Sequence, residues 1–122
     1  MEDLAIDEVA GLKLNARLES GKLLALLCHA PAALLATVDE QGRSPFATRK
    51  LTALSNREEL LNSFARKAPW LLEDRLKELG ASYSKGLIPL RPHVVVDGNL
   101  YTGQNPQSSA KLAEALIAKI AE

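Results

Sequence analysis

The sequence of 122 residues predicts an α/β fold with a parallel sheet. Segments with helical spacing of apolar residues alternate with short apolar runs that are bounded by glycine, proline or aspartate. One run, residues 23–27, is unbroken apolar sequence between Gly21 and Pro31. It is too short for a helix and is typical of a strand buried on both faces, as in a parallel sheet. The length allows one domain at most.

The first half begins with a predicted helix over residues 6–18, which Ser20-Gly21 ends in the manner of a glycine C-cap. The strand at 23–27 follows, and Pro31 suits the first turn of a helix that runs through residues 36–37. Residues 39–42 read as a turn, and residues 43–54 as loop and then strand. The expected apolar face of the first helix consists of Ile6, Val9, Ala10, Leu12, Leu14 and Leu18.

In the second half, Ser55-Asn56 can cap a helix from near Glu58 to about Phe64. Residues 69–79 predict a clearer helix, and 81–83 a short strand. Asp97-Gly98 predicts a hairpin between strands 93–96 and 99–102, and a loop at 104–106 follows. Ser108-Ser109 caps a last helix over 110–120. The expected apolar faces are Trp70, Leu71, Leu72, Leu76 and Leu79 in the 69–79 helix, and Leu112, Leu116, Ile117 and Ile120 in the last helix.

Composition and charge exclude several classes of partner. Lys plus Arg and Asp plus Glu both number 15, so the net charge is zero and nothing favours a nucleic acid or an anionic membrane. The apolar runs are far shorter than a membrane span, and Met1-Glu2-Asp3 is acidic where a signal peptide would be basic. The single cysteine, Cys28, cannot form an internal disulfide, which fits a reducing cytoplasm.

Cys28 lies where the predicted strand passes into the predicted helix, followed by His29. A strand, a sharp turn with a nucleophile and a helix form a nucleophile elbow, which lifts the side chain above the carboxyl end of the sheet. The helix start behind it favours the reactive thiolate. Most lone cysteines are small buried hydrophobes, but the position between Leu27 and His29-Ala30-Pro31 favours a functional role.

Four segments carry a resemblance to the ThiJ/PfpI superfamily. "ALLCHAPAALL" resembles its Cys-His-Gly/Ala-Pro elbow, and "LTALSNREE" its Asn-x-Glu-Glu segment. "APWLLEDRLKELGASY" and "PHVVVDGNLYTGQNPQSSAKLAEAL" resemble the stretches that follow, up to the last helix. Ala30, Ala53 and Leu54 stand where the family commonly has glycine, glycine and an aromatic residue. The resemblance covers the whole chain and is greatest to the heat-shock-31-like, glyoxalase III-like branch, whose members are often labelled type 1 glutamine amidotransferase-like.

The resemblance implies a partial flavodoxin-like doubly wound sheet, with three α/β/α layers and a nucleophile elbow. It also implies a catalytic triad. Carried over, Cys28 is the nucleophile, His29 the general base and Glu59 the carboxylate that orients the imidazole. Glu58 competes for the last role, because a shift of one residue would exchange the two. His93, at the start of a strand, is interpreted as structural.

The family has several βα units and a Gly-rich loop before the elbow, and nothing in this sequence resembles them. "MEDLAIDEVAGL" resembles the stretch after that loop. We therefore expect residues 1–122 to be the C-terminal portion of one ThiJ/PfpI-like domain, with its N-terminal βα units missing. The strand at 23–27 would then have an open edge. A marginal, aggregation-prone or homodimeric chain is expected, with residues 94–96 and the last helix as candidate contact surface.

By resemblance, the expected activity is glyoxalase III-like or D-lactate dehydratase-type conversion of methylglyoxal to lactate, a protection against reactive aldehydes. No cofactor or metal is expected, and the partner is a small aldehyde. Turnover by this chain alone would be low, because half of the oxyanion hole is expected to be missing. The alternative is a non-catalytic, chaperone-like or remnant fragment. Glutamine amidotransfer ranks lower, since Val94-Val95 follows His93 where a His-x-Glu pair is needed, and cysteine peptidase activity ranks lowest.

Overall fold

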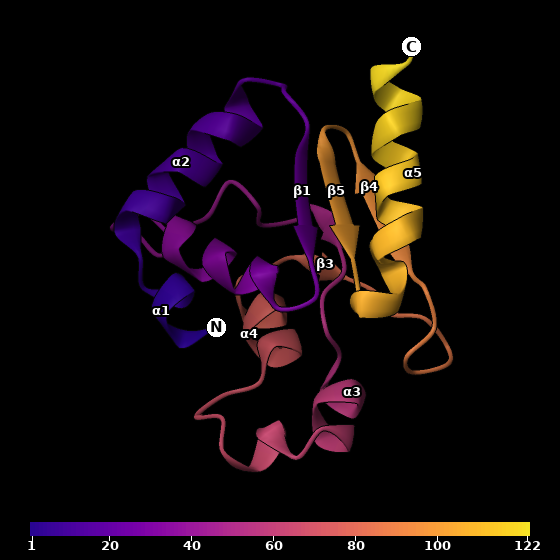
Figure 1. Cartoon of the computed structure of the whole chain (residues 1–122). Coiled ribbons are helices and arrows are strands. Elements are labelled where there is room, and N and C mark those ends of the chain that lie inside the picture. Colours follow the sequence, from indigo (N-terminus) through magenta and orange to yellow (C-terminus); the bar gives the residue numbers. More distant parts are fainter.

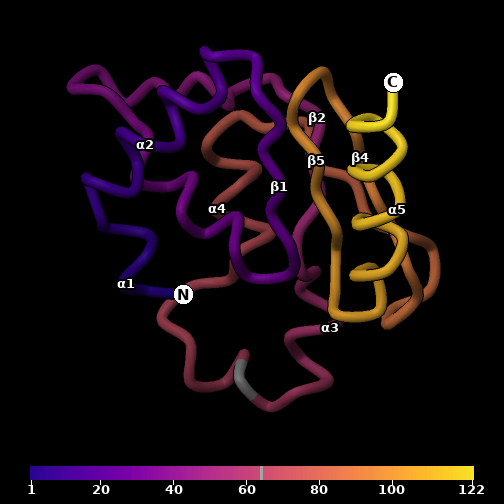
Figure 2. Tube along the Cα trace, turned by 45° about the horizontal axis from the view of Figure 1, so that its top comes forward, coloured from indigo at the N-terminus to yellow at the C-terminus, as the bar shows by residue number. Residues whose placement is uncertain are grey.

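A mixed sheet with helices on both sides forms the body of the molecule in the computed structural model (Figure 1). The structure describes residues 1–63 and 65–122 (Figure 2). The helices are α1 (Glu2–Ala5), α2 (Glu8–Glu19), α3 (Asn56–Leu61), α4 (Leu72–Glu78) and α5 (Ser109–Ile120), with the 3₁₀ helices η1 (Ala30–Thr37) and η3 (Pro106–Ser108). The strands are β1 (Leu24–Leu27), β2 (Lys50–Leu51), β3 (Ser82–Tyr83), β4 (Val94–Asp97) and β5 (Leu100–Gly103).

The main sheet has the strand order β1-β5-β4, with β1 parallel and β4 antiparallel to β5. The short strands β2 and β3 form a separate parallel pair. Helix α5 packs beside β5, whereas η1 packs against β1 and is covered by α1, α2 and α4 (Figure 1). The predicted α/β class is thereby confirmed, and so is a partial sheet with layers of helices.

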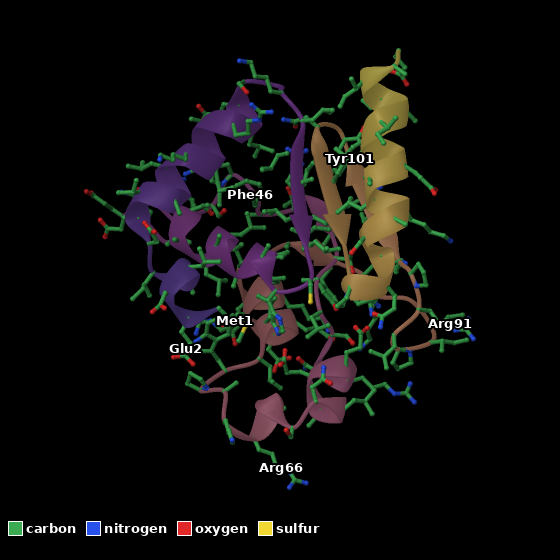
Figure 3. The ribbon with its side chains drawn as sticks, viewed as in Figure 1. Met1, Glu2, Phe46, Arg66, Arg91 and Tyr101 are labelled. Carbon is green, nitrogen blue, oxygen red and sulfur yellow. The ribbon has the colours of Figure 1, made fainter. Side chains whose placement is uncertain are left out.

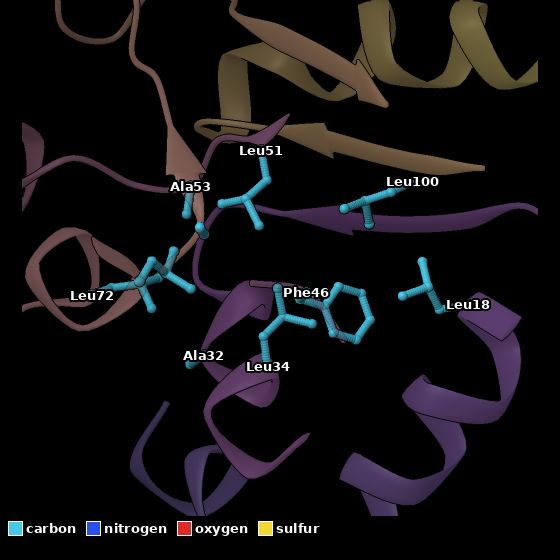
Figure 4. Close-up of a cluster of buried hydrophobic side chains, with 10 residues drawn as sticks. Leu18, Ala32, Leu34, Phe46, Leu51, Ala53, Leu72 and Leu100 are labelled. Carbon is cyan, nitrogen blue, oxygen red and sulfur yellow. The ribbon is translucent and has the colours of Figure 1, made fainter. Parts of the chain in front are cut away.

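The hydrophobic core fills the space between η1 and the strands (Figure 4). Phe46 and Leu34 are fully buried there, next to Leu100 of β5 and Leu76 of α4. Burying side chains of this size stabilises the fold by roughly 1.5–3 kcal/mol each. This core joins η1 to the sheet and so fixes the turn that precedes η1.

Strand β1 is less buried than its apolar run predicts. Leu24, Leu26 and Leu27 are half-buried and Ala25 is exposed. The reason is the strand order: β1 lies at the edge of the sheet and, in the part of the chain that the structure describes, pairs with β5 alone. Burial on both faces was therefore a wrong prediction for this strand, while the open edge is present as expected.

The predicted apolar face of the first helix is also wrong in part. Ile6, Val9 and Leu12 are 79%, 62% and 70% exposed. The side of α2 that faces η1 carries Gly11 and Leu18, both buried. A Cβ atom on Gly11 would lie only 2.0 Å from the carbonyl oxygen of Ala36 in η1. The close approach of the two backbones, rather than the most apolar stripe, sets the orientation of α2.

The last helix follows its prediction more closely. Helix α5 begins at Ser109, and its Leu112 is buried and Leu116 half-buried. Ile117 and Ile120 are 65% and 73% exposed, because the short sheet does not extend beneath the C-terminal turns. The expected apolar face is thus covered only in its first half.

Element boundaries differ in several other places. The 31–37 segment is a 3₁₀ helix, and α4 begins at Leu72 rather than at residue 69. Helix α3 begins at Asn56, two residues before the expected start, and the expected end at Phe64 lies outside the described residues. The hairpin turn at Gly98, with φ of 60°, is confirmed. None of the described helices is both long and apolar enough to cross a bilayer.

Candidate active site

Cys28 follows β1 directly and has a left-handed backbone, with φ of 61°. Its N–H donates to the carbonyl oxygen of Gly103 at 2.9 Å, and its own carbonyl accepts from the N–H of Leu54 at 3.0 Å. A non-glycine residue in this region is strained by about 1–3 kcal/mol and persists only where its surroundings hold it. The strand, the strained turn and the helix start together have the geometry of a nucleophile elbow.

His29 lies directly before η1 and follows Cys28 in the chain. Its ring lies beside the sulfur of Cys28. Nδ1 of His29 is 3.7 Å from Sγ of Cys28. The side chain of His29 is 40% exposed, so one side of the ring faces solvent. Pro31, in the first turn of η1, fits there because that turn needs no N–H from it.

Glu59 reaches His29 from α3. The carboxylate Oε2 of Glu59 lies 2.7 Å from Nε2 of His29, and Glu59 is only 4% exposed. Helix α3 begins with a capping box, in which Ser55 and Glu58 satisfy one another's backbone N–H groups. This fixes the first turn of the helix and therefore the direction of Glu59.

Glu58, the competing acid, points elsewhere. Its carboxylate accepts hydrogen bonds from Gln104, Asn105 and Ser55, and it is fully buried. The structure thus brings Cys28, His29 and Glu59 together and places Glu58 in a different network. The sequence alone does not distinguish Glu58 from Glu59, and it predicts only a loop at residues 104–106. The one available signal was a pair of amide side chains directly after a strand.

His93 is held in another part of the fold. Its Nε2 lies 3.2 Å from Oγ of Ser84, and its backbone N–H and carbonyl both bond to Oγ of Ser108. These contacts tie the start of β4 to η3. They agree with the interpretation of His93 as structural.

The electrostatics of the site favour a charged imidazole. The hydrogen bond with Cys28 raises the pKa of His29 most, partial burial lowers it, and the hydrogen bond and charge of Glu59 raise it further, to about 9. His29 is therefore an imidazolium at neutral pH.

A cavity of about 460 Å³ opens beside His29 and Glu59. This volume accommodates a small organic molecule. Among the described residues, no three His, Cys, Asp or Glu side chains lie close enough to hold a metal ion. The cavity is lined by Met1, Glu2, Asp3, His29, Glu59, Lys67 and Ala68, of which Met1 and Glu2 are labelled in Figure 3.

A cysteine on a strained turn after a sheet strand, with a histidine and a carboxylate in line, defines an α/β protein with an elbow-type nucleophile site. No protein-family model matches the sequence. The chain is 32% identical over 106 residues to the glutathione-independent glyoxalase hsp3101 of Schizosaccharomyces pombe, covering 80% of this chain and 43% of that protein. The chain thus spans less than half the length of this curated relative.

Solved structures give the same result. The crystal structure of APC35852 superposes with a TM-score of 0.88 and 32% identity, over 98% of this chain and 53% of that one. Glyoxalase III from Candida albicans superposes with a TM-score of 0.73 and 25% identity, over 86% of this chain and 46% of that one. The chain is thus similar in sequence and in fold to proteins named glyoxalase, and the predicted resemblance to the ThiJ/PfpI superfamily is confirmed.

Proposed function

We propose that Cys28, His29 and Glu59 form the catalytic centre of a glutathione-independent glyoxalase, which converts methylglyoxal to lactate. The observation that carries the proposal is the continuous line of contacts from Sγ through the imidazole to a buried carboxylate. The names of the relatives supply the substrate class: hsp3101 is a glutathione-independent glyoxalase, and the Candida albicans protein is a glyoxalase III.

The first step is attack of the Cys28 thiolate on the aldehyde carbon of methylglyoxal. A C–S bond forms, the carbonyl π bond breaks, and the imidazolium of His29 donates its proton to the resulting alkoxide. The product is a hemithioacetal, and His29 is left neutral. The elevated pKa of His29, about 9, supplies the proton at neutral pH.

The second step moves a proton between the two carbons. Neutral His29 removes the proton from the former aldehyde carbon, which gives an enediolate, and returns this proton to the neighbouring carbon, while the hydroxyl proton of the first carbon passes to the oxygen of the second. A thioester of lactate results, and water hydrolyses it to lactate and free Cys28. The oxidation of one carbon balances the reduction of the other, so no redox cofactor is needed.

Glu59 determines which ring nitrogen of His29 exchanges the proton with the substrate. Nε2–H of His29 donates to Oε2 of Glu59 at 2.7 Å, so Nδ1, which faces the sulfur, is the nitrogen that exchanges the proton. Low turnover by this chain alone is part of the proposal. The chain spans less than half the length of hsp3101, and a developing oxyanion needs several fixed donors.

The test is lactate formation from methylglyoxal, without glutathione, by the purified chain at high concentration. We expect lactate above the buffer control, loss in Cys28→Ser and His29→Gln, and retention in His93→Gln, which alters the histidine outside the site. Equal lactate from Cys28→Ser contradicts the proposal. So does an absence of lactate combined with a Cys28 that iodoacetamide alkylates no faster than free cysteine.

A second candidate, binding of unfolded clients, is favoured by exposed apolar side chains. Leu87 and Ile88 are 97% and 60% exposed, and Leu60 and Leu61 of α3 are 64% and 61% exposed. Large exposed apolar surface is typical of sites that bind other proteins. This function predicts suppression of client aggregation that is unchanged in Cys28→Ser and reduced in Leu87→Ser.

A further inference from the structure

Glu58 is a fully buried carboxylate that the proposed chemistry does not use. Its Oε1 accepts hydrogen bonds from N–H and Oγ of Ser55, at 3.1 and 2.8 Å, and from Nε2 of Gln104 at 2.6 Å. Its Oε2 accepts from Nδ2 of Asn105 at 2.7 Å and from N–H of Leu90 at 3.0 Å. Five donors therefore converge on one side chain.

The carboxylate is ionised at neutral pH. Burial by itself raises the pKa of Glu58, but the hydrogen bonds from Gln104, Asn105 and Ser55 outweigh it and hold the pKa below its usual value. Removal of a donor leaves a buried charge of this kind less well compensated, which is destabilising.

The five donors come from three separate parts of the chain. Gln104 and Asn105 follow directly on β5, whose last residue, Gly103, accepts the N–H of Cys28. Leu90 lies in the loop before β4 and has a strained left-handed backbone with φ of 64°. Glu58 thus joins α3 to the same strand end that holds the nucleophile.

Helix α3 has only six residues, and a helix of this length is not stable by itself. Its place relative to β5 must come from tertiary contacts. The backbone N–H of Asn56 bonds to Glu73, which connects α3 to α4. The contacts of Glu58 with Gln104 and Asn105 connect α3 to the end of β5.

We propose that Glu58 is a positioning residue, which fixes the first turn of α3 to the end of β5 and so holds Glu59 at hydrogen-bond distance from His29. Neighbouring carboxylates then have different roles: Glu59 touches the imidazole, and Glu58 determines where Glu59 stands. This inference rests on the proposed function only in giving the His29–Glu59 contact a catalytic role. Its test needs no turnover.

The test compares Glu58→Gln with the original chain by two readouts: the pKa of His29 from NMR titration, and the pH profile of Cys28 alkylation by iodoacetamide. The amide introduced at position 58 places an NH₂ group against N–H donors, so α3 has to shift. We expect the pKa of His29 to fall by about one unit as Glu59 withdraws, and the alkylation profile to change with it. The titratable groups beside His29 are Cys28 and Glu59, with Glu2, Asp3 and Lys67 on the cavity wall.

Two further variants separate positioning from general loss of stability. Leu76→Ala removes a fully buried side chain of α4 and lowers the melting temperature without touching the Glu58 network, so the pKa of His29 should stay the same. Gln104→Leu removes one of the five donors and should lower the pKa of His29 by less than Glu58→Gln does. If Glu58→Gln does not fold, Gln104→Leu tests the same inference in its place.

A lower melting temperature with an unchanged pKa of His29, in Glu58→Gln or in Gln104→Leu, overturns the inference, because the network would then be merely structural. An equal fall of that pKa in Leu76→Ala overturns it as well. The proposed function fails independently, if Cys28→Ser forms lactate as the original chain does.

Discussion

Nε2 of His29 lies 2.7 Å from Oε2 of Glu59, although 30 positions separate the two residues in the sequence. The contact joins the turn after β1 to the first turn of α3, so it exists only in the folded chain. Between an imidazolium and a carboxylate, this distance is that of a strong, charge-assisted hydrogen bond. The protonation of the site is therefore tied to the packing of α3.

Glu59→Gln should lower the pKa of His29 from about 9 by about one unit. The amide keeps the shape of the side chain but removes the negative charge that favours the imidazolium. NMR titration of the two histidines measures the change, and His93→Gln assigns the resonances. A pKa of His29 that remains near 9 in Glu59→Gln contradicts a role for Glu59 in orienting the ring.

The stability of the fold should fall as the pH rises from about 6.5 to about 9. The pKa of His29 is raised from 6.5 to about 9 on folding, so the folded state holds the proton more tightly than the unfolded state. The contribution is fully present below pH 6.5 and is lost as the pH rises through 9. Urea denaturation at several pH values should show a weaker pH dependence in His29→Gln. An equal pH dependence of stability in the original chain and in His29→Gln would show that His29 is not its cause.

Cys28→Gly should be more stable than Cys28→Ala by about 1 kcal/mol, because only glycine adopts a left-handed backbone without strain. The φ of 61° at this position is the basis of the expectation. Both variants lose the thiol, so their comparison isolates the backbone term. Urea denaturation measures it, and equal midpoints would indicate that the turn relaxes when the cysteine is absent.

Gly11→Ala should destabilise the fold by about 3 kcal/mol, since overpacking against a backbone carbonyl cannot be relieved by a side-chain rotation. The new Cβ atom would lie 2.0 Å from the carbonyl oxygen of Ala36. In an isolated helix the same change is stabilising by about 1 kcal/mol. Gly42→Ala serves for comparison: the added atom meets nothing within 4 Å, but the φ of 76° strains it, so a smaller loss of about 1 kcal/mol is expected. A higher melting temperature for Gly11→Ala would mean that α2 and η1 are not in close contact.

We expect the chain to self-associate through the open edge of β1. Edge strands with unpaired backbone groups pair readily with other chains, and a charged side chain on the edge opposes this. Ala25 is exposed in the middle of β1, so Ala25→Lys should reduce association. Sedimentation velocity over a range of concentrations tests the expectation, with Gln41→Lys in the exposed turn at 39–42 as control. A monomeric original chain that melts sharply contradicts it.

Much of the local structure could be predicted because it depends on neighbouring residues. Ser55 caps α3, and the turn at 39–42 closes on the side chain of Asp39, which accepts from the N–H groups of Gln41 and Arg43. Asp97-Gly98 makes the hairpin because glycine tolerates the φ that the turn requires. These signals act over a few positions and survive without tertiary context.

Exposure could not be predicted in the same way. Ile6, Val9 and Leu12 form a regular stripe, and all three are exposed. Periodicity identifies a helix with an apolar side, but which side faces the core depends on what the helix meets. Here α2 meets the backbone of η1, where only Gly11 fits.

The sequence by itself determined the order of the elements, the place of Cys28 between a strand and a helix, and the neighbouring His29, because these depend on local preferences and covalent adjacency. Only the tertiary structure shows that Glu59, and not Glu58, contacts His29. The two residues are adjacent on one helix turn, and their directions are set by distant partners, His29 for one and Gln104 with Asn105 for the other. These contacts join residues that are 30 to 47 positions apart, so the local sequence does not indicate which of the two glutamates faces His29.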